Sequence, residues 1–570
     1  MKKEHLCRLK TPFENEKDGW NQYPRPQMAR ESFLSLCGEW NLTAVKNDQA
    51  TPIGTITVPF PPESALSGIE RTPEKGEHYV YEKIFHAEEN FLNETILLHF
   101  GAVDQIATVF LNGVELGRHI GGYLPFTFDV TEHIRIGENK IRVEVYDDLD
   151  TDIPYGKQSK KRGGMWYTPI SGIWQTVWME SVPKNHISSI RITPSLHDIA
   201  LEVNGGIEEK LVTIQTPSGY LEHRFYGNKT VIEIPDINLW TPENPYLYHF
   251  TVASGADYVK SYFALRTITI EEKNGKSYLA LNGKPYFFHG LLDQGYFSDG
   301  IYLPASPKGY ENDVKTMKDL GFNMLRKHIK IEPEAFYYDC DRYGMIVFQD
   351  MVNNGKYSFL ADTALPTLGL KKGISHPPTD RRRELFEKEA TKTLAHLYNH
   401  PCVCYYTIFN EGWGQYDADA LYEKFKKIDP TRIFDATSGW FEEEKSDVKS
   451  EHIYFKKINL TRSERPLVLS EFGGYSCKIE GHSFNLDKTY GYRFFDDKEK
   501  FMTALEDLYI DEVVPMIKKG LCATVLTQLS DVEDETNGLF TYDRQVLKVD
   551  TARMQLIAED LYDTFAKRTK

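Results

Sequence analysis

The second half of the chain alternates between short apolar segments and amphipathic helical segments, and this alternation limits the fold more than any other feature of the sequence. Strands that alternate with helices form parallel sheets, and eight such strands predict a closed (β/α)8 TIM barrel. An open doubly wound sheet is the alternative, but the first strand is followed by HGLLDQGYFSDG, which lacks the Gly-x-Gly-x-x-Gly turn of such folds. The apolar segments lie at 284–292, 323–329, 345–351, 403–411, 432–439, 452–455, 466–474 and 521–530, with helical patterns at 310–322, 332–344, 381–401 and 501–520.

The first half of the chain predicts two all-β units. From about 34 to 182, alternating stretches such as TVFLNGVELGRH and NKIRVEVYDD are separated by Asn-Gly and Gly-Gly turns, which is the pattern of a β-sandwich. A second series of strands, from about 186 to 270, has the spacing of an immunoglobulin-like β-sandwich. We therefore predict a multidomain β and α/β protein with domains at 1–182, 183–270 and 271–570.

Composition and charge exclude several classes of protein. The 570 residues carry a formal net charge of −16 and 26% of them are charged, so the composition is that of a globular protein and a nucleic acid is not the expected partner. No apolar window reaches the roughly 18 residues of a membrane span, and no apolar segment follows the basic start MKKEHLCRLK. The seven cysteines show neither a Cys-x-x-Cys pair nor zinc spacing. We expect a cytoplasmic protein with buried thiols that binds no membrane.

Aromatic residues are frequent, at 13% of the chain, with 34 Tyr, 32 Phe and 8 Trp. Such residues fill the cores of β-sandwiches, and they also stack on the C–H faces of sugars. The composition favours the first explanation and leaves the second open.

Two glutamates stand at the carboxyl ends of apolar runs, where a barrel of this kind places its active site. The run CVCYYTIF is followed by Asn410 and Glu411, and PLVLS is followed by Glu471, with glycines after each glutamate. Two carboxylates that face each other suit the cleavage of a glycosidic bond, because one donates a proton to the leaving oxygen while the other attacks or stabilises the anomeric carbon. Alternatively, either glutamate alone caps a helix or pairs with Arg326.

Six segments of the chain together resemble one known family. They are GAVDQIATVFLNGVELGRHIGGYLPFTFDVT, ISGIWQTVWME, NGKPYFFHGLLDQGY, LGFNMLRKH, IFNEGWG and LSEFGG. These segments are similar to segments of glycoside hydrolase family 2, which contains β-galactosidases, β-glucuronidases and β-mannosidases. The resemblance covers nearly the whole chain in the family's domain order, and it implies a sugar-binding-type jelly roll, an immunoglobulin-like sandwich and a catalytic barrel.

The resemblance also implies roles for individual residues. Glu411 matches the family's general acid/base and Glu471 its nucleophile. Asn410 matches the residue that binds the sugar 2-hydroxyl, and Tyr454 matches in placement a tyrosine that touches the nucleophile. A retaining mechanism needs the two carboxyl groups about 5–5.5 Å apart, with the nucleophile kept ionised by donors such as Arg326 and Tyr454. This chemistry needs no cofactor.

One departure from the family bears on negatively charged sugars. β-Glucuronidases carry an Asn-x-Lys motif that binds the sugar carboxylate, and the matching positions here hold Glu535, Thr536 and Asn537. A substrate carboxylate would meet like charge in this loop, so we expect a neutral sugar to be preferred. The same loop contains three further acids, Asp531, Glu533 and Asp534.

Two basic segments are candidates to offset that charge. On the second barrel strand, Arg326 is followed by His328 and Lys330, whose side chains share its face by alternation. In the first domain, the loop at 157–162 is basic where relatives often place an acidic residue that reaches the sugar. Charged residues of this loop are either solvated or in contact with substrate, and solvation is the more common outcome. They are Lys160, Lys161 and Arg162.

Other candidate contacts lie at strand ends. Asp350 follows the third strand without the Glu-x-His that supports magnesium in large β-galactosidases, so we expect no metal site. Trp440 is a candidate stacking platform or a packing residue of the barrel rim, and His452 points into the mouth beside Tyr454. The predicted catalytic residues are Glu411 and Glu471, and the predicted substrate-binding residues are Gln294, Arg326, His328, Asp350, Asn410, Trp440, Tyr454 and Gln528.

These patterns favour a retaining exo-β-glycosidase that hydrolyses a terminal β-linked sugar by double displacement. We expect a β-galactosidase, with a β-glucuronidase or β-galacturonidase as the alternative. A transferase that uses the same intermediate, and a non-catalytic carbohydrate-binding protein on the same fold, are two further classes, although the second should have lost one of the two glutamates. The expected partner is a small glycoside or oligosaccharide, and a homo-oligomer is compatible with the sequence.

Overall fold

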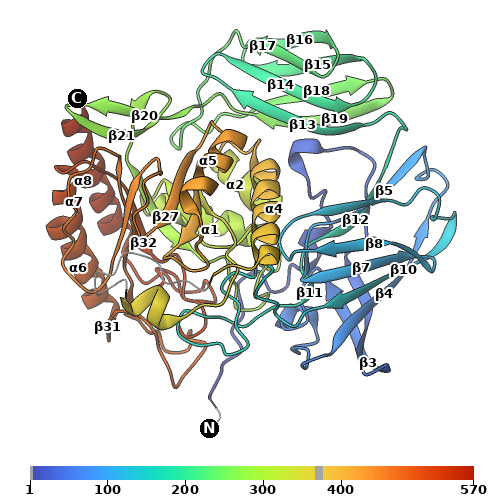
Figure 1. Cartoon of the computed structure of the whole chain (residues 1–570), viewed down its shortest axis with the longest axis horizontal. Helices are drawn as coiled ribbons and strands as arrows, with labels where there is room; N and C mark the ends of the chain where they lie inside the picture. The colour runs from blue at the N-terminus through green and yellow to red at the C-terminus, as the bar shows by residue number, and fades with distance from the viewer. Residues whose placement is uncertain (1–3, 366–376) are drawn as a thin grey trace.

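The computed structural model describes residues 4–365 and 377–570 and arranges them around three cores (Figure 1). The predicted domains that include residues 1–3 and 366–376 therefore extend outside the described residues. One core fills a sandwich between residues 36 and 179, a second fills another sandwich between residues 187 and 265, and the third is the barrel core. Leu9 and Trp20 pack into the barrel core and Met28 into the second sandwich, so the N-terminal segment connects the other two domains.

The first sandwich is a jelly roll of two main antiparallel sheets. Along β10 (Gly137–Tyr146), Ile141, Val143 and Val145 are buried and alternate with more exposed residues, which is why one face of the sheet packs on the core. One sheet has the order β1 (Leu34–Ser35), β12 (Val177–Val182), β5 (Thr95–Phe100), β9 (Phe126–Asp129). The other has the order β3 (Gln49–Val58), β2 (Gly38–Lys46), β4 (His78–Ala87), β10, β7 (Ile106–Leu111), β8 (Val114–Ile120), and β6 (Val103–Asp104) pairs with β11 (Gly172–Ile173).

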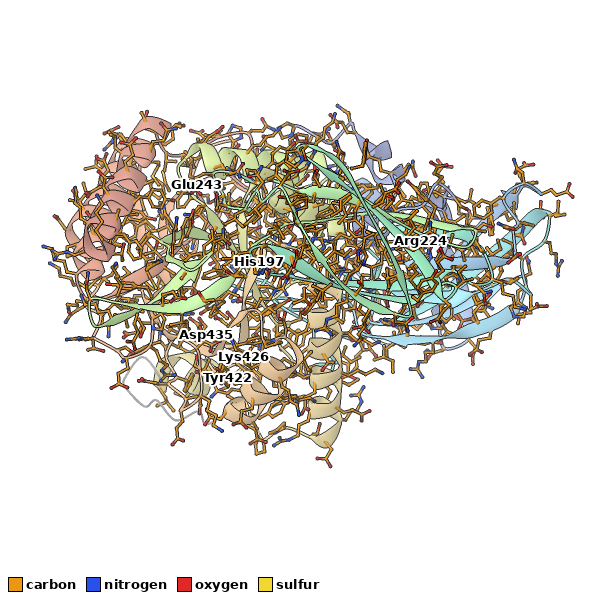
Figure 2. The ribbon with its side chains drawn as sticks, turned by 90° about the horizontal axis from the view of Figure 1, so that it is seen from above. His197, Arg224, Glu243, Tyr422, Lys426 and Asp435 are labelled. Atoms are coloured by element: carbon orange, nitrogen blue, oxygen red, sulfur yellow. The ribbon has the colours of Figure 1, made fainter. Side chains whose placement is uncertain are left out.

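The second sandwich lies across the top of the other two domains (Figure 1). Seen from above, its residue Arg224 lies over the jelly roll and His197 over the barrel (Figure 2). Asn399 of the barrel donates to the carbonyl of Ile190 at 2.7 Å, which fixes one edge of this sandwich on the barrel. Its two sheets have the orders β13 (Ile187–Pro194), β14 (Asp198–Gly205), β17 (Lys229–Glu233) and β16 (Gly219–Tyr226), β15 (Glu209–Thr216), β18 (Tyr248–Ser254), β19 (Asp257–Phe263).

The barrel is a sheet of eight strands in which every neighbouring pair is parallel. Before it, β20 (Ile268–Lys273) crosses the predicted boundary at 270 and pairs with β21 (Lys276–Leu281), which pairs with β22 (Lys284–Pro285). All eight residues of β26 are buried, as its unbroken apolar run predicts for a strand covered on both faces. The strand order is β27 (Ile433–Ser438), β26 (Val403–Asn410), β25 (Ile346–Asp350), β24 (Met324–Lys327), β23 (Phe288–Asp293), β32 (Leu521–Thr527), β29 (Leu467–Gly473), β28 (Lys449–Ile453).

Helices cover most of the outside of the barrel, and several begin at a side-chain cap. Thr379 accepts from the Arg382 amide at the start of α4, and Asp497 and Asp550 do the same for α6 and α8. Figure 2 shows Tyr422 and Lys426 of α5 beside Asp435 of β27. The helices are α1 (Lys308–Asp319), α2 (Glu334–Tyr343), α4 (Asp380–Leu397), α5 (Ala418–Ile428), α6 (Lys498–Leu508), α7 (Val514–Ile517) and α8 (Thr551–Thr569), with π-turns at η4 (Phe359–Ala364) and η5 (Tyr509–Val513).

The barrel is least regular at β27 and β28, the two end strands of the sheet. They lie close together, but within the described residues no hydrogen-bonded ladder joins them. The connections at 439–448 and 454–466, both fully described, contain no helix. A pocket of about 230 Å³ lies there, lined by Trp440, His452, Tyr454 and others.

The predicted fold class, a jelly-roll β-sandwich, an immunoglobulin-like β-sandwich and a TIM barrel, is confirmed. All seven cysteines are free and five of them are buried. Among the described helices, none combines the length and the apolar character that crossing a membrane requires.

Candidate active site

Glu411 stands just beyond the end of β26, at a sharp turn of the backbone. Its φ is 53° and that of Gly412 is 73°, so the chain leaves the strand through two left-handed residues. A Cβ on Gly412 would lie 2.1 Å from Cε2 of Phe441, which explains the glycine. The Glu411 amide donates to the Ser438 carbonyl of β27 at 2.8 Å, and the turn therefore presents the carboxylate at the mouth, with 13% of the side chain exposed.

Glu471 lies inside β29 and is more deeply buried, with 6% of its side chain exposed. Arg326 Nη1 donates to Oε1 at 3.0 Å, and the hydroxyl of Tyr454 donates to Oε2. Burial alone would raise the pKa of this carboxyl, but His452, Arg326 and His328, together with the Tyr454 hydroxyl, lower it below its usual value. Glu471 is therefore held as a carboxylate.

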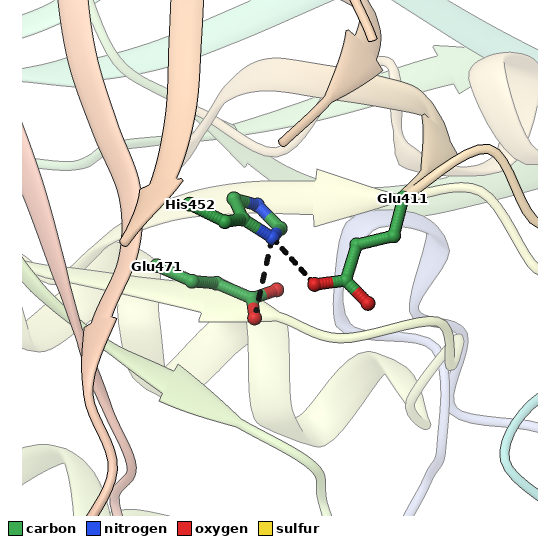
Figure 3. A group of neighbouring side chains, drawn as sticks. All are labelled: Glu411, His452 and Glu471. Atoms are coloured by element: carbon green, nitrogen blue, oxygen red, sulfur yellow. Dashed lines mark hydrogen bonds and ion pairs between the residues drawn. The ribbon is translucent and has the colours of Figure 1, made fainter. Parts of the chain in front are cut away.

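His452 lies between the two carboxylates (Figure 3). Its Nδ1 is 2.8 Å from Oε1 of Glu411 and 3.5 Å from Oε2 of Glu471, and a carboxylate oxygen of each glutamate lies within 4.8 Å of the other. Its Nε2 lies 3.1 Å from the Ser438 hydroxyl and 3.3 Å from Nη1 of Arg326. Contacts at both ring nitrogens hold the imidazole in place, and its Nδ1 in turn positions the Glu411 carboxyl group.

Arg326 connects the catalytic pair to the second and third strands. Its Nε donates to Oδ1 of Asp350 at 3.0 Å, and its Nη2 donates to Oδ1 of Asn410 at 2.9 Å. His328 Nδ1 lies 2.7 Å from the other oxygen of Asp350. Burial would raise the pKa of Asp350, but Arg326 and His328 lower it. The predicted residues Arg326, His328, Asp350 and Asn410 thus form one network below the two glutamates.

The residues present do not fit a metal ion. Both oxygens of Asp350, the position that matches the magnesium region of large β-galactosidases, already bind Arg326 and His328. Glu411, His452 and Glu471 offer three donor atoms within 4.8 Å of one another, but the guanidinium of Arg326 occupies Oε1 of Glu471. The guanidinium would repel a divalent cation at this position, which disfavours metal binding there.

Two family models match the chain in the order of its domains. A model described as "Glycosyl hydrolase 2 galactose-binding domain-like" matches residues 69–183, within the jelly roll. A model described as "Glycosyl hydrolases family 2, TIM barrel domain" matches residues 272–546, which contain both glutamates. The chain belongs to glycoside hydrolase family 2.

Relatives within family 2 carry different names. A β-galactosidase of Thermoanaerobacter pseudethanolicus is 25% identical over 61% of this chain and 46% of its own length, and human β-glucuronidase is 25% identical over 60% of this chain and 56% of its own. The chain thus spans about half the length of these curated relatives. Among solved structures, a β-D-glucuronidase of Dictyoglomus thermophilum matches with a TM-score of 0.74 at 18% identity, covering 96% of this chain and 98% of that one. A family 2 β-galacturonidase of Eisenbergiella tayi matches with a TM-score of 0.66 at 18% identity over 95% of this chain and 97% of that one. At such identities the structures support the fold alone.

The remaining predicted contacts of this family 2 chain are Trp440, Gln294 and Gln528. Trp440 lies edge-on to His452, with ring centroids 6.3 Å apart, and lines the pocket between β27 and β28. Gln528 donates to Oδ1 of Asn537 at 2.8 Å, and Gln294 follows β23. Among the described residues, the side-chain carbonyl oxygens of Gln294 and Gln528 are buried without a hydrogen-bond partner, so both can accept from a ligand.

The structure changes the interpretation of Lys330. The sequence allowed this lysine to reach the pocket, but its Nζ donates to the carbonyls of Gly295 and Tyr302, at 2.5 and 2.8 Å, and to Glu332 at 2.9 Å. Only 2% of its side chain is exposed, and burial lowers its pKa to about 8. Lys330 is therefore a structural cation and does not compensate a substrate charge.

The acids in the loop after β32 have partners in the structure, whereas the sequence led us to expect uncompensated negative charge there. Asp531 pairs with Lys548 at 2.5 Å, and Asp534 pairs with Arg162 of the jelly roll at 3.0 Å. Oε1 of Glu533 accepts from a jelly-roll amide at 2.9 Å. Arg162 is thus bound to protein, whereas Lys160 and Lys161 of the same loop are exposed, as solvation predicts.

Two features of the site were missed by reasoning from the sequence. His452 was placed in the mouth by alternation, but its bridge between Glu411 and Glu471 depends on the bend of the chain at Glu411. Lys157 of the jelly roll was included only as part of a basic loop. The glycine before it was the available signal: Gly156 has a φ of +66°, and a Cβ there would lie 2.9 Å from the carbonyl of Ile329 in the barrel.

Proposed function

We propose that this chain is a retaining β-glycosidase that removes a terminal β-linked sugar by double displacement, with Glu471 as nucleophile and Glu411 as acid/base. The observation that carries the proposal is the spacing of the two carboxylates, which have oxygens within 4.8 Å of each other. Retaining enzymes need a short separation, of about 5–5.5 Å, whereas inverting enzymes leave about 6.5–9.5 Å for a water molecule.

In the first step, Oε2 or Oε1 of Glu471 attacks the anomeric carbon while Glu411 gives its proton to the leaving oxygen. The glycosidic C–O bond breaks and a covalent glycosyl ester forms on Glu471. In the second step, Glu411 takes a proton from water, the oxygen of that water attacks the anomeric carbon, and Glu471 leaves as a carboxylate. If an acceptor hydroxyl replaces water, the same steps give transglycosylation.

The surrounding residues support this division of roles. Arg326 and Tyr454 donate to Glu471, and the lowered pKa of Glu471 keeps the nucleophile ionised before attack. Glu411 lies at the more exposed position, hydrogen-bonded to His452, so it can exchange protons with the leaving group and with water. We expect Asn410, which Arg326 orients, to bind the 2-hydroxyl, as the family resemblance implies.

For the sugar, we propose a neutral hexoside, with β-galactoside as first choice and a β-uronide as alternative. Positions 535–537 lack a lysine, and Lys330, one of the cations considered for a uronide, is bound within the protein. A cytoplasmic location and a homo-oligomeric state stay predictions.

A panel of p-nitrophenyl β-glycosides tests the proposal. We expect kcat/KM for the β-galactoside to exceed that for the β-glucuronide by a factor of about ten or more, because a uronate would enter a buried site beside the Glu535 carboxyl. A higher kcat/KM for the glucuronide or galacturonide would replace the neutral-sugar assignment. Mass spectrometry after reaction with a 2-deoxy-2-fluoro glycoside should place the label on Glu471, and a label elsewhere would refute the mechanism.

A further inference from the structure

Lys157, in a jelly-roll loop that contacts the barrel, has an ammonium group without a protein partner. Its residue is 8% exposed, and among the described residues no hydrogen bond or ion pair engages its Nζ. The group lies 5.6 Å from the ring centroid of Trp166, a contact that orients it without neutralising it. The Nζ is not among the fully buried atoms that lack a partner, so the ammonium is accessible and can donate to a ligand.

The backbone places Lys157 next to a buried acid of the barrel. The amide of Tyr167 donates to the Lys157 carbonyl at 3.1 Å, and the hydroxyl of Tyr167 donates to Glu535. Burial raises the pKa of Glu535, while Tyr167 and the charge of Lys157 act in the opposite direction. Lys157 and Glu535 thus interact through charge, although no ion pair joins them.

Hydrogen bonds and chain neighbours connect Glu535 to the catalytic centre. Glu535 neighbours Gln528, which follows Thr527, and the hydroxyls of Thr527 and Tyr454 lie 2.8 Å apart at Glu471. The charge of Lys157 also acts on this centre, because burial lowers the pKa of His328, against the hydrogen bond with Asp350, and Lys157 lowers it further.

We propose that Lys157 and Glu535 together bind a hydroxyl of the terminal sugar, at a carbon other than C1 and C2, and that this pair selects neutral sugars. A hydroxyl can accept from the ammonium and donate to the carboxylate at the same time. A sugar carboxylate can only accept, so it would gain Lys157 but meet Glu535. The inference rests on the proposed function, and it assigns substrate selection to a residue of the jelly roll.

The test combines a side-chain change with removal of the hydroxyl. Lys157→Met should lower kcat/KM for p-nitrophenyl β-galactoside about 10- to 100-fold, the usual worth of a hydrogen bond to a charged group. One of the 3-, 4- and 6-deoxy galactosides lacks the hydroxyl that Lys157 is proposed to bind. For that substrate, kcat/KM should be equally low with the wild type and with the variant. Lys161→Met, which alters an exposed lysine of the same loop, should leave every substrate unchanged. Glu535→Gln should show the same deoxy-sugar pattern, and the double variant should lose less than the sum of the two single losses.

Each other result counts against the inference. An unchanged kcat/KM in Lys157→Met, or an equal loss on the parent and on all three deoxy sugars, would overturn it, and the fraction of enzyme labelled by the 2-fluoro glycoside shows whether the variant is folded. A wild-type preference for a glucuronide that Lys157→Met abolishes would show that Lys157 binds a carboxylate instead. If the wild type neither cleaves nor binds a neutral glycoside, the proposed function fails together with the inference. If it cleaves galactosides and only the Lys157 result is negative, the proposed function stands alone.

Discussion

The barrel supplies the floor of the candidate site from the ends of its own strands, whereas the jelly roll and a barrel loop share the rim. In the floor, Arg326, Asp350 and Glu471 come from strands that are hydrogen-bonded into one sheet, and every one of these charges is paired. In the rim, Lys157 and Glu535 come from different domains and form no ion pair with each other. A paired floor fixes the reacting groups, whereas the Lys157 ammonium of the rim has no protein partner among the described residues.

The contact between domains determines the geometry of the rim. Tyr155 of the jelly roll donates to the carbonyl of Gly355 in the barrel at 2.8 Å, and its amide donates to the Asn353 carbonyl at 3.1 Å. Small shifts between the domains would therefore move Lys157 while the floor stayed in place. This difference predicts that changes in the floor abolish turnover and that changes in the rim alter the choice of sugar.

The largest effect is expected from the floor residue Glu471. Glu471→Gln removes the nucleophile without changing the size of the side chain, and kcat for the β-galactoside should fall on the order of 10⁴-fold or more. Steady-state kinetics on the purified variant measure this, and the parallel variant Glu443→Gln, at an acid outside the floor, controls for the substitution itself. A loss of less than about tenfold would show that another group attacks the sugar.

A smaller and selective effect is expected from Glu411→Ala. Proton donation contributes about 10²–10⁴-fold, so turnover of substrates with poor leaving groups should fall by that factor. Activated substrates such as dinitrophenyl glycosides need no protonation and should still form the intermediate. External azide should then restore turnover by attacking the glycosyl-enzyme, and an equal loss on both kinds of substrate without azide rescue would contradict the role of Glu411.

The difference between floor and rim also explains how far the sequence predicts the site. Alternation along an apolar strand fixes which side chains face inward, so Arg326, Asn410 and Glu471 could be placed together before the structure was known. These positions depend only on one strand and on the rule that barrel sites lie at the carboxyl ends of strands.

The rim could not be predicted in this way. Lys330 has the right spacing for the pocket, but Ile329 has a φ of 53°, which ends the alternation, and Glu332 binds the ammonium. The acids after β32 formed a cluster in the sequence, yet Arg162 and Lys548 approach them from elsewhere in the fold. Partners that are distant in the chain decide whether such charges are free, and a single sequence does not contain that information.

Lys330 gives a prediction that sharpens this point. Lys330→Met should destabilise the fold by about 3 kcal/mol, because it breaks a buried ion pair while Lys327 still binds Glu332 at 2.8 Å. Denaturant unfolding measures the loss, and Lys46→Met, at an exposed pair, should leave the unfolding midpoint unchanged. The ratio of galactoside to glucuronide kcat/KM should not change. A changed ratio with unchanged stability would mean that Lys330 contacts the substrate.

The smallest effect is a shift in pH dependence caused by Tyr454→Phe. The pKa of Glu471 in the native protein is lower than its usual value of 4.5, and the Tyr454 hydroxyl is one of the groups that lower it. Without this donor the pKa of Glu471 rises, so the nucleophile becomes protonated at a higher pH as the solution is acidified. The acidic limb of kcat/KM should therefore move to higher pH in the variant, while the alkaline limb, which reports the acid form of Glu411, should move less. Tyr492→Phe, which keeps the ring that stacks on Tyr454 at 4.2 Å, should leave the acidic limb in place. An acidic limb that stays fixed in Tyr454→Phe would show that Arg326 and the neighbouring histidines alone set the charge of the floor.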